Sequence, residues 1–263
     1  MDKIKIAFTQ NWQKEYVSEA LKEKNSGLDF LAQTADDEKQ AWLLLEQGEC
    51  DAIFVNMAKI PMLIPDNLII TAVSKRFSPQ YELLIKKEKQ SENRSLDLAA
   101  DATIFVTDEC LPFLLKEISS NFVFSNEKTT SDALILPAYE VEKNNIPTKD
   151  WASTTLNPRE FMPAAAQGVF AYVCNKNDVE TRRFLKNLHH SDSSELTNIE
   201  RSFVKLNEGK ICAAYCEKDK MDNFHLWVAV VQENGTVTSA RASTSTKVGL
   251  AEAAMKRILE HMD

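Results

Sequence analysis

The sequence lacks any apolar run of the ~18 residues that a membrane-spanning helix needs. Its first residues, MDKIKIAF, lead directly into a strand pattern, so we expect a cytoplasmic protein. Positive charge is also scarce, because 31 lysines and arginines stand against 39 acidic residues and give a net charge of -8. Nucleic acids and anionic membranes bind basic surfaces. We therefore expect neither as a partner.

Cysteine is infrequent, and its five positions are scattered along the chain: Cys50, Cys110, Cys174, Cys212 and Cys216. An odd number of cysteines without regular spacing argues against a disulfide framework. Cys212 and Cys216 together with His225 could suggest a zinc site. However, the segment has a strand pattern that separates the two thiols, and the sequence contains no second cysteine pair. We predict no metal site.

The sequence does contain enough apolar side chains for buried cores. Hydrophobic residues make up 44% and charged residues 27% of the 263 positions, which is typical of a globular chain. This length predicts two or three domains rather than one.

Alternating strand and helix patterns predict an α/β unit at the beginning of the chain. Residues 4–8 alternate apolar and polar side chains as a strand does, and residues 12–21 switch to helical spacing. A second helix at 38–46 leads into a strand at 52–55. Strands joined by helices form parallel sheets with right-handed crossovers.

A second α/β unit of similar layout follows. Strands are predicted at 103–106 and 133–136, with a helix at 111–118 between them. Residues 169–174 form a continuous apolar run, which is typical of a strand covered on both faces, and we assign this strand to the second unit.

The last part of the chain has a different pattern. Strands are predicted at 212–217, 224–232 and 236–242, and an Asn-Gly turn joins the last two. Residues 247–262 have the spacing of a closing helix. These elements predict an antiparallel sheet covered by one helix.

The segment 163–209 contains three motifs in a specific order. They are a Pro-Ala-x-x-Gln-Gly turn before a buried strand, a Thr-Arg-x-x-Leu helix that ends near a pair of histidines, and a Glu-Arg helix followed by Glu-Gly. The matching residues are Pro163, Ala164, Gln167, Gly168, Thr181, Arg182, Leu185, Asn187, His189, His190, Glu200, Arg201, Glu208 and Gly209. In this order they resemble the porphobilinogen deaminase family, also called hydroxymethylbilane synthase.

The resemblance implies an α/β fold with two periplasmic-binding-protein-like domains around a cleft and a small C-terminal α+β domain with an antiparallel sheet. Domain 1 would comprise residues 1–76 with 193–208, domain 2 residues 77–192, and the third domain residues 209–263. It also implies a transferase of tetrapyrrole, or porphyrin, biosynthesis, which condenses four porphobilinogen units into hydroxymethylbilane and releases ammonia. We expect a monomer that holds a small molecule in the interdomain cleft.

The family's catalytic aspartate has no counterpart at the matching position. Residues 56–61 resemble the family's His-Ser-Met-Lys-Asp-Val-Pro, with Met57 and Pro61 in register, so that Lys59 stands in place of the aspartate. In the family, a buried carboxylate steadies the cationic azafulvene formed from porphobilinogen and shuttles protons. The charge of Lys59 would repel that cation. We therefore predict a degenerate active site without standard deaminase catalysis.

The arginines that bind the acetate and propionate groups of the family's substrate and cofactor are also missing. The motif Gly-Thr-Ser-Ser-x-Arg-Arg matches residues 106–112, which contain Asp108 and Glu109 but no arginine. Lysine or neutral residues reproduce a guanidinium fork poorly. Asp108 and Glu109 form either an acid site or a solvated loop pair, and Gln167 either binds a ligand or completes a tight turn. The candidate ligand-binding residues are Asn56, Thr107, Asp108 and Gln167.

The family attaches a dipyrromethane cofactor to a cysteine just after Glu-Gly-Gly. Here Glu208 and Gly209 are followed by Lys210, Ile211 and Cys212. An ungapped alignment puts Ile211 at the position of the cysteine, one inserted residue restores Cys212, and a third alignment deletes the loop. A dipyrromethane is therefore expected only if Cys212 carries it.

Two functions remain open from the sequence. In the first, the chain performs the family reaction and Cys212 carries the primer. In the second, it is a divergent, non-catalytic module that binds a small ligand or regulates through the two-domain cleft. The loss of the catalytic carboxylate and of the arginines favours a divergent protein without deaminase activity.

Overall fold

The computed structural model describes residues 3–24, 27–91, 95–99, 102–146 and 148–261. The chain forms two compact units. Unit 1 is Met1–Phe77 with Gly168–Glu195, and unit 2 is Ser78–Gln167 with Leu196–Asp263. Among the described residues, every helix is too short or too polar to span a lipid bilayer.

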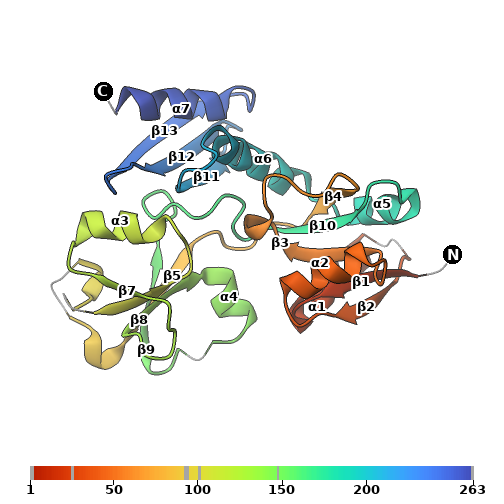
Figure 1. The fold of residues 1–263 in the computed structure, drawn as a ribbon, viewed down its shortest axis with the longest axis horizontal. Helices are drawn as coiled ribbons and strands as arrows, with labels where there is room; N and C mark the ends of the chain where they lie inside the picture. The colour runs from red at the N-terminus through yellow and green to blue at the C-terminus, as the bar shows by residue number, and fades with distance from the viewer. Residues whose placement is uncertain (1–2, 25–26, 92–94, 100–101, 147, 262–263) are drawn as a thin grey trace. The chain divides into compact units, whose positions relative to one another are not determined.

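Unit 1 contains one sheet with helices (Figure 1). Its elements are β1 (Ile4–Phe8), α1 (Asn11–Glu23), β2 (Phe30–Thr34), α2 (Glu38–Glu46), β3 (Ala52–Asn56), the short 3-10 helix η1 (Met57–Lys59), β4 (Leu68–Val73), β10 (Phe170–Asn175), α5 (Val179–Leu185) and η4 (Lys186–Leu188).

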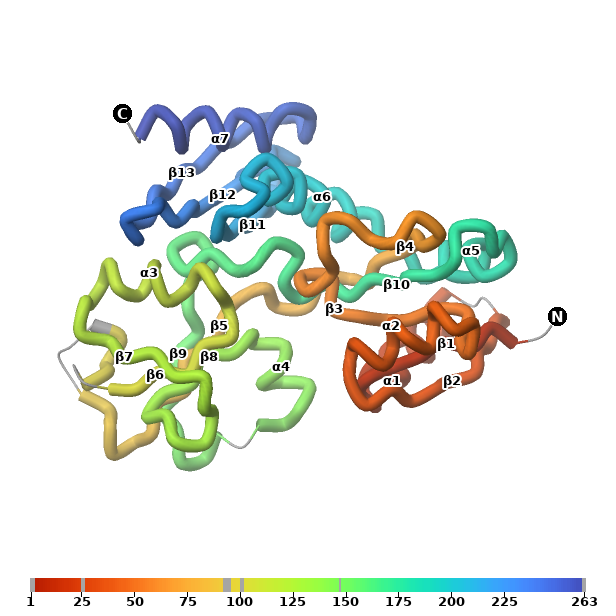
Figure 2. The backbone as a smooth tube through the Cα atoms, in the orientation of Figure 1, coloured from red at the N-terminus to blue at the C-terminus, as the bar shows by residue number. Residues whose placement is uncertain are grey.

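The sheet of unit 1 has the strand order β2-β1-β3-β10-β4. The pairs β1/β2 and β1/β3 are parallel, as the alternation of strands and helices predicted. The apolar strand β10 is antiparallel to both β3 and β4, and Figure 2 shows it running beside them. Its assignment to the second unit is therefore wrong. The residues of β10 are buried from Phe170 to Cys174, so that side chains on both faces of this central strand are covered, as the continuous apolar run predicted.

Unit 2 contains a second five-stranded sheet and a three-stranded sheet. Its elements are β5 (Tyr81–Lys86), η2 (Lys87–Lys89), η3 (Ser95–Asp97), β6 (Thr103–Val106), α3 (Leu111–Ile118), β7 (Val123–Ser125), β8 (Ala133–Pro137), α4 (Ala138–Lys143), β9 (Trp151–Leu156), residues 196–206 of α6 (Ser191–Leu206), β11 (Cys212–Lys218), β12 (Phe224–Val231), β13 (Val237–Thr244) and α7 (Leu250–Glu260).

The five-stranded sheet of unit 2 has the order β7-β6-β8-β5-β9 and shares a core with the C-terminal segment. Leu111 and Leu115 of α3 belong to the same buried cluster as Ala213 of β11 and Ala229 of β12. The segment 209–263 thus lies in one compact unit with residues 78–167 and shares this core with them, while it also forms a second core with α6 and α7.

The three-stranded sheet is antiparallel, in the order β11-β12-β13, and α7 packs along one of its faces (Figure 1). The sequence predicted this helix at residues 247–262, and in the structure it spans Leu250–Glu260. Residue 262 lies outside the described residues. Two side chains near the end of α7 reach the outer side of β13. Arg257 donates a hydrogen bond of 2.5 Å to the backbone carbonyl of Arg241. Nδ1 of His261 donates one of 3.2 Å to the backbone carbonyl of Ser239.

The predicted fold class is confirmed: the chain combines two α/β units, each with a five-stranded sheet, and a small antiparallel sheet near the C-terminus. The division into three domains at residues 76, 192 and 208 remains a prediction. The strand pairing itself places β10 with the first sheet.

Candidate functional site

The end of β3 positions two of the predicted site residues, both in unit 1. Asn56 is buried, with 7% exposure, and its side-chain oxygen accepts a hydrogen bond of 3.0 Å from the backbone of Ala58. Asn56 therefore caps η1, which uses an oxygen that a ligand would otherwise contact. Lys59 ends η1 and is exposed to solvent. The position that the resemblance matches to a catalytic aspartate thus carries a solvated cation.

Gln167 lies in unit 2 at the turn that precedes β10. It is buried, and its Nε2 donates a hydrogen bond of 2.6 Å to the carbonyl of Pro79. Its neighbours Ala166 and Gly168 have φ angles of 68° and 78°, which is the left-handed region. This geometry supports the tight-turn interpretation of Gln167.

Asp108 follows β6 and stands before the first turn of α3. One carboxylate oxygen accepts hydrogen bonds from the backbone N–H groups of Cys110, at 2.8 Å, and Leu111, at 2.7 Å. These N–H groups at the start of α3 have no partner within the helix, so Asp108 satisfies them as a capping residue does. Its neighbours Thr107 and Glu109 are exposed.

The surroundings of Asp108 oppose its ionisation. Burial raises the pKa of the Asp108 carboxyl, and the two backbone hydrogen bonds and Tyr81 only partly offset that rise. Burial also raises the pKa of Tyr81 well above its ordinary value, with Asp108 as the next cause. Among the described residues, the buried Tyr81 hydroxyl has no hydrogen-bond partner. Asp108 therefore affects Tyr81 through its charge and not through a hydrogen bond of ordinary geometry.

Cys212 is the first residue of β11 and is half-buried. Burial raises the pKa of its thiol to about 11, and the charge of Asp108 contributes to the rise. Because the thiolate is the nucleophile, a thiol with this pKa reacts slowly at neutral pH. Asp108 and Cys212 both belong to unit 2, and the charge of Asp108 acts on the thiol.

Glu200, which belongs to the Glu-Arg motif, is a buried structural residue. It is fully buried on α6, where one carboxylate oxygen accepts from the backbone of Ala166, at 2.7 Å, and the other from that of Cys216, at 2.8 Å. It thus ties the turn before β10 to β11. The signal in the sequence is an acidic residue within an apolar helical stripe that includes Ile199 and Phe203.

The structure separates the residues of the zinc alternative. Cys216 pairs with Leu226 across β11 and β12, so His225, the next residue along β12, projects from the opposite face of the sheet. Over the described part of the chain, no group of three or more His, Cys, Asp or Glu side chains is arranged to hold a metal ion.

The fold defines an α/β protein of the periplasmic-binding-protein type. The crystal structure of a methionine-binding protein aligns with it at a TM-score of 0.50 and 14% identity, and the match covers 73% of this chain and 92% of that one. No protein-family model matches the chain.

Several curated relatives are named porphobilinogen deaminase. The relative from Fusobacterium nucleatum is 26% identical over 177 residues, which covers 63% of this chain and 57% of that protein. The relative from Desulforamulus reducens is 24% identical over 229 residues, with 75% and 72% covered. The one from Acetivibrio thermocellus is 28% identical over 171 residues, with 63% and 57% covered. The chain thus spans little more than half the length of the first and third of these relatives.

Proposed function

We propose that the chain is a porphobilinogen deaminase-like protein that lacks the standard deaminase chemistry and binds a small molecule. The names of its curated relatives support a distant connection to tetrapyrrole biosynthesis. The family reaction needs a carboxylate beside the developing azafulvene cation, whereas this chain has the exposed Lys59 at the matching position.

The observation that carries the proposal is the exposed Lys59 at the position that the resemblance matches to the catalytic aspartate, and the effect of Asp108 on Cys212 supports it. A dipyrromethane bears acetate and propionate groups, and an acidic side chain next to its attachment point repels them. The same side chain helps to keep the Cys212 thiol protonated. A site that both repels the carboxylates and suppresses the thiolate opposes attachment of this cofactor.

The second candidate function is the family reaction itself, with Cys212 as the attachment point of dipyrromethane. It is favoured by the half-burial of Cys212, which leaves part of the residue accessible, and by its place just after the Gly209 turn, where φ is 81°. In this case an alignment with one inserted residue matches Cys212 to the family's cysteine.

The mass of the intact protein, expressed in a host that makes porphobilinogen, separates the two functions. We expect the unmodified mass and no consumption of porphobilinogen, while a curated relative expressed in the same host provides the positive control. A mass increase corresponding to a dipyrromethane would contradict our proposal. If that adduct disappears in Cys212→Ala but not in Cys50→Ala, the second function is established instead.

The small molecule bound in place of the tetrapyrrole is not identified by these residues. Asn56, Thr107, Asp108 and Gln167 stay predictions as ligand contacts, and so do the cytoplasmic location and the monomeric state. Thermal-shift measurements with small, non-tetrapyrrole metabolites test the binding function. A raised melting temperature that Asp108→Asn abolishes would place the ligand near Asp108.

A further inference from the structure

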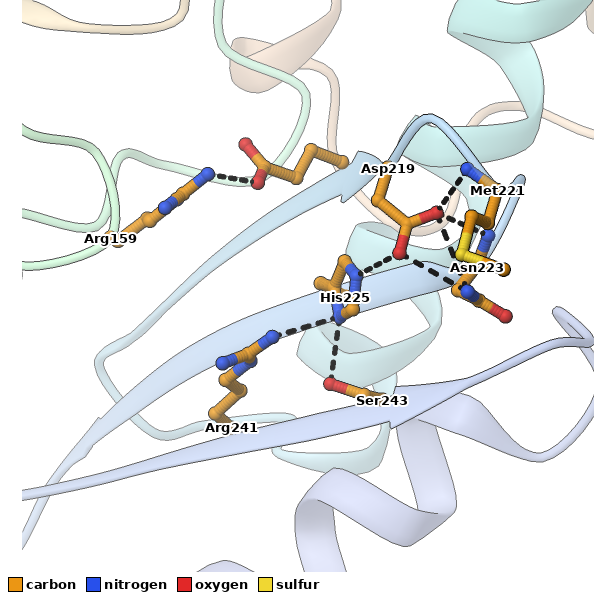
Figure 3. A network of polar contacts seen from close by, with 8 residues as sticks. Arg159, Asp219, Met221, Asn223, His225, Arg241 and Ser243 are labelled. Carbon is orange, nitrogen blue, oxygen red and sulfur yellow. Dashed lines mark hydrogen bonds and ion pairs between the residues drawn. The ribbon is translucent and has the colours of Figure 1, made fainter.

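One face of the three-stranded sheet in unit 2 carries a polar network near the turn between β11 and β12 (Figure 3). Its side chains form two neighbouring rows across the strands: Tyr215, Trp227 and Arg241, and then Glu217, His225 and Ser243. The opposite face of the sheet packs against α7 and includes Cys212. The network shares its face with Ala213 and Ala229, which pack with α3, but it contains neither Asp108 nor Cys212.

His225 stands at the centre of this network. Its Nε2 lies 3.1 Å from a carboxylate oxygen of Asp219, and its Nδ1 lies 2.8 Å from the Ser243 hydroxyl and 3.0 Å from the Arg241 guanidinium (Figure 3). These contacts come from three different segments: the turn after β11, strand β12 and strand β13.

Asp219 fixes the proton on His225. Hydrogen bonds from the side chain and then the backbone of Asn223 hold the pKa of Asp219 well below its usual range. A carboxylate only accepts hydrogen bonds, so Nε2 of His225 must donate to it. The neutral imidazole then has a single lone pair, on Nδ1.

Two donors compete for that single lone pair. The Ser243 hydroxyl at 2.8 Å satisfies Nδ1 by itself, which makes the N–H of Arg241 redundant at this position. The guanidinium can therefore turn to another acceptor without leaving the half-buried imidazole nitrogen unsatisfied. An unused donor of this kind is what a binding site for an acceptor requires.

The charge of Arg241 is also not neutralised. Its guanidinium carbon lies 4.9 Å from the centre of the Trp227 ring, and that of Arg159 lies 5.0 Å from the same ring. Arg159 forms an ion pair with Glu217 at 2.5 Å. Among the described residues, Arg241 has no corresponding carboxylate partner, although the whole chain carries a net charge of -8. The indole ring thus holds an exposed, uncompensated guanidinium in place.

We propose that Arg241 and Ser243, supported by His225 and Trp227, form a binding site for a small oxyanion, the phosphate or carboxylate group of a metabolite. On binding, the guanidinium turns from Nδ1 to two oxygens of the anion, which match its planar fork. Ser243 remains on Nδ1 and keeps His225 satisfied. This activity does not depend on the proposed loss of deaminase chemistry, because it uses neither Lys59, Asp108 nor Cys212.

The experiment is a titration of the full chain with sodium phosphate, and separately with sodium acetate, at constant ionic strength maintained with chloride. The readout is the set of indole N–H signals in a ¹H–¹⁵N NMR spectrum. The chain has four tryptophans, and Trp227→Phe assigns the signal of interest. We expect a saturable shift of the Trp227 signal with little change at Trp12, Trp42 and Trp151. The anion with the lower dissociation constant identifies the preferred group.

Three variants test the assignment. Arg241→Gln should weaken binding by about tenfold or more, because it removes the charge-assisted hydrogen bonds. Arg241→Lys, which retains the charge and loses the fork, should weaken it by about threefold or more. Ser243→Ala leaves the charge unchanged, yet it should also weaken binding by about threefold or more, because release of Arg241 would then leave Nδ1 without a donor.

Arg183→Gln is the matched control, since it removes one exposed arginine from α5 in unit 1. We expect it to bind as the wild type does. The proposal is overturned if neither anion gives a saturable shift at Trp227, or if Arg241→Gln and Arg183→Gln change the affinity equally. Unchanged affinity in Ser243→Ala would overturn the exchange of donors at His225.

Discussion

Two features of the structure have opposite effects on the ionisation of Asp108. Its carboxylate caps α3 through hydrogen bonds of 2.8 and 2.7 Å, whereas burial disfavours its charge and raises its pKa. The same charge acts on Cys212, whose thiol has a pKa of about 11. One substitution at Asp108 should therefore change the reactivity of a second residue.

The first prediction concerns the reactivity of that thiol. In Asp108→Asn, the amide oxygen can still cap α3, but the negative charge is lost, so the pKa of Cys212 should fall and its alkylation at pH 8 should become faster. The rate of iodoacetamide labelling, read by peptide mass, checks this. Cys50 is the internal control. Its thiol pKa is also raised to about 11, but by burial and then by Asp51, so the substitution at Asp108 should leave its labelling rate unchanged. Equal acceleration at both cysteines would contradict the prediction.

The second prediction concerns the pH dependence of folding. Because the pKa of Asp108 is raised in the folded state, the folded protein binds this proton more tightly than the unfolded chain does. Its contribution to stability is present below the ordinary pKa of aspartate and is lost as the pH rises through the folded value. The free energy of unfolding of Asp108→Asn, relative to the wild type, should thus increase between pH 4 and pH 7. Urea unfolding at several pH values measures it, and a constant difference would count against the burial argument.

The role of individual residues was only partly predictable from the sequence. Lys59 and Asp108 could be placed by motif register, and the exposure of Lys59 and the capping by Asp108 became visible only in the structure. Asn56 and Gln167 were candidates for ligand binding because they belong to the segments that resemble the family's motifs. Their side chains instead bond to the backbone of Ala58 and Pro79, which no local pattern reveals.

At the scale of elements, Glu200 links three segments that are distant in the sequence. Its two oxygens hold the Ala166 turn and β11 to α6. Ala166 adopts a φ of 68°, a conformation that costs an alanine roughly 1–3 kcal/mol and therefore needs support from its surroundings.

The third prediction follows from this link. Glu200→Gln replaces one of the two carboxylate oxygens by an NH₂ group. This group cannot accept the hydrogen bond from the backbone N–H that it faces, so the substitution should destabilise the protein by about 1–3 kcal/mol. Glu200→Ala leaves both N–H groups without a partner and should cost more. Denaturant unfolding monitored by circular dichroism measures both changes. Glu208→Gln, at an exposed position near the end of the same segment, should stay within about 0.5 kcal/mol of the wild type.

Strand positions were predicted better than strand partners. The alternating pattern of β1 and the apolar run of β10 indicate strands because burial leaves a local trace in the sequence. The pairing of β10 with β3 and β4 depends on contacts more than 90 residues apart, which chain order does not reveal. The short strand β7 and the exposed strand β9 escaped prediction, since three residues or a run of Ser and Thr give little periodicity.

At the scale of the whole molecule, the C-terminal segment shares one core with residues 78–167, in addition to the core that it forms with α6 and α7. Ala213 and Ala229 are buried in the cluster that contains Leu111 and Leu115. A segment that shares its core in this way is not expected to unfold as an independent domain.

The fourth prediction is that α3 and the strands β11 to β13 unfold together. In native-state hydrogen exchange at increasing denaturant, their slowest amides should merge into a single unfolding transition. The amides of β1 and β3 in unit 1 provide the comparison. A separate, lower-energy transition confined to residues 209–263 would show that the C-terminal segment is a domain in its own right.

The contacts of Arg257 and His261 with the outer carbonyls of β13 have a consequence for assembly. A sheet edge with free carbonyls is a template on which another chain can add a strand. Here two of those carbonyls already accept hydrogen bonds from α7, so the helix that covers the face of the sheet also closes its border. In this way the sheet can resist the addition of strands along β13, while the side chain of Arg241 remains exposed to solutes.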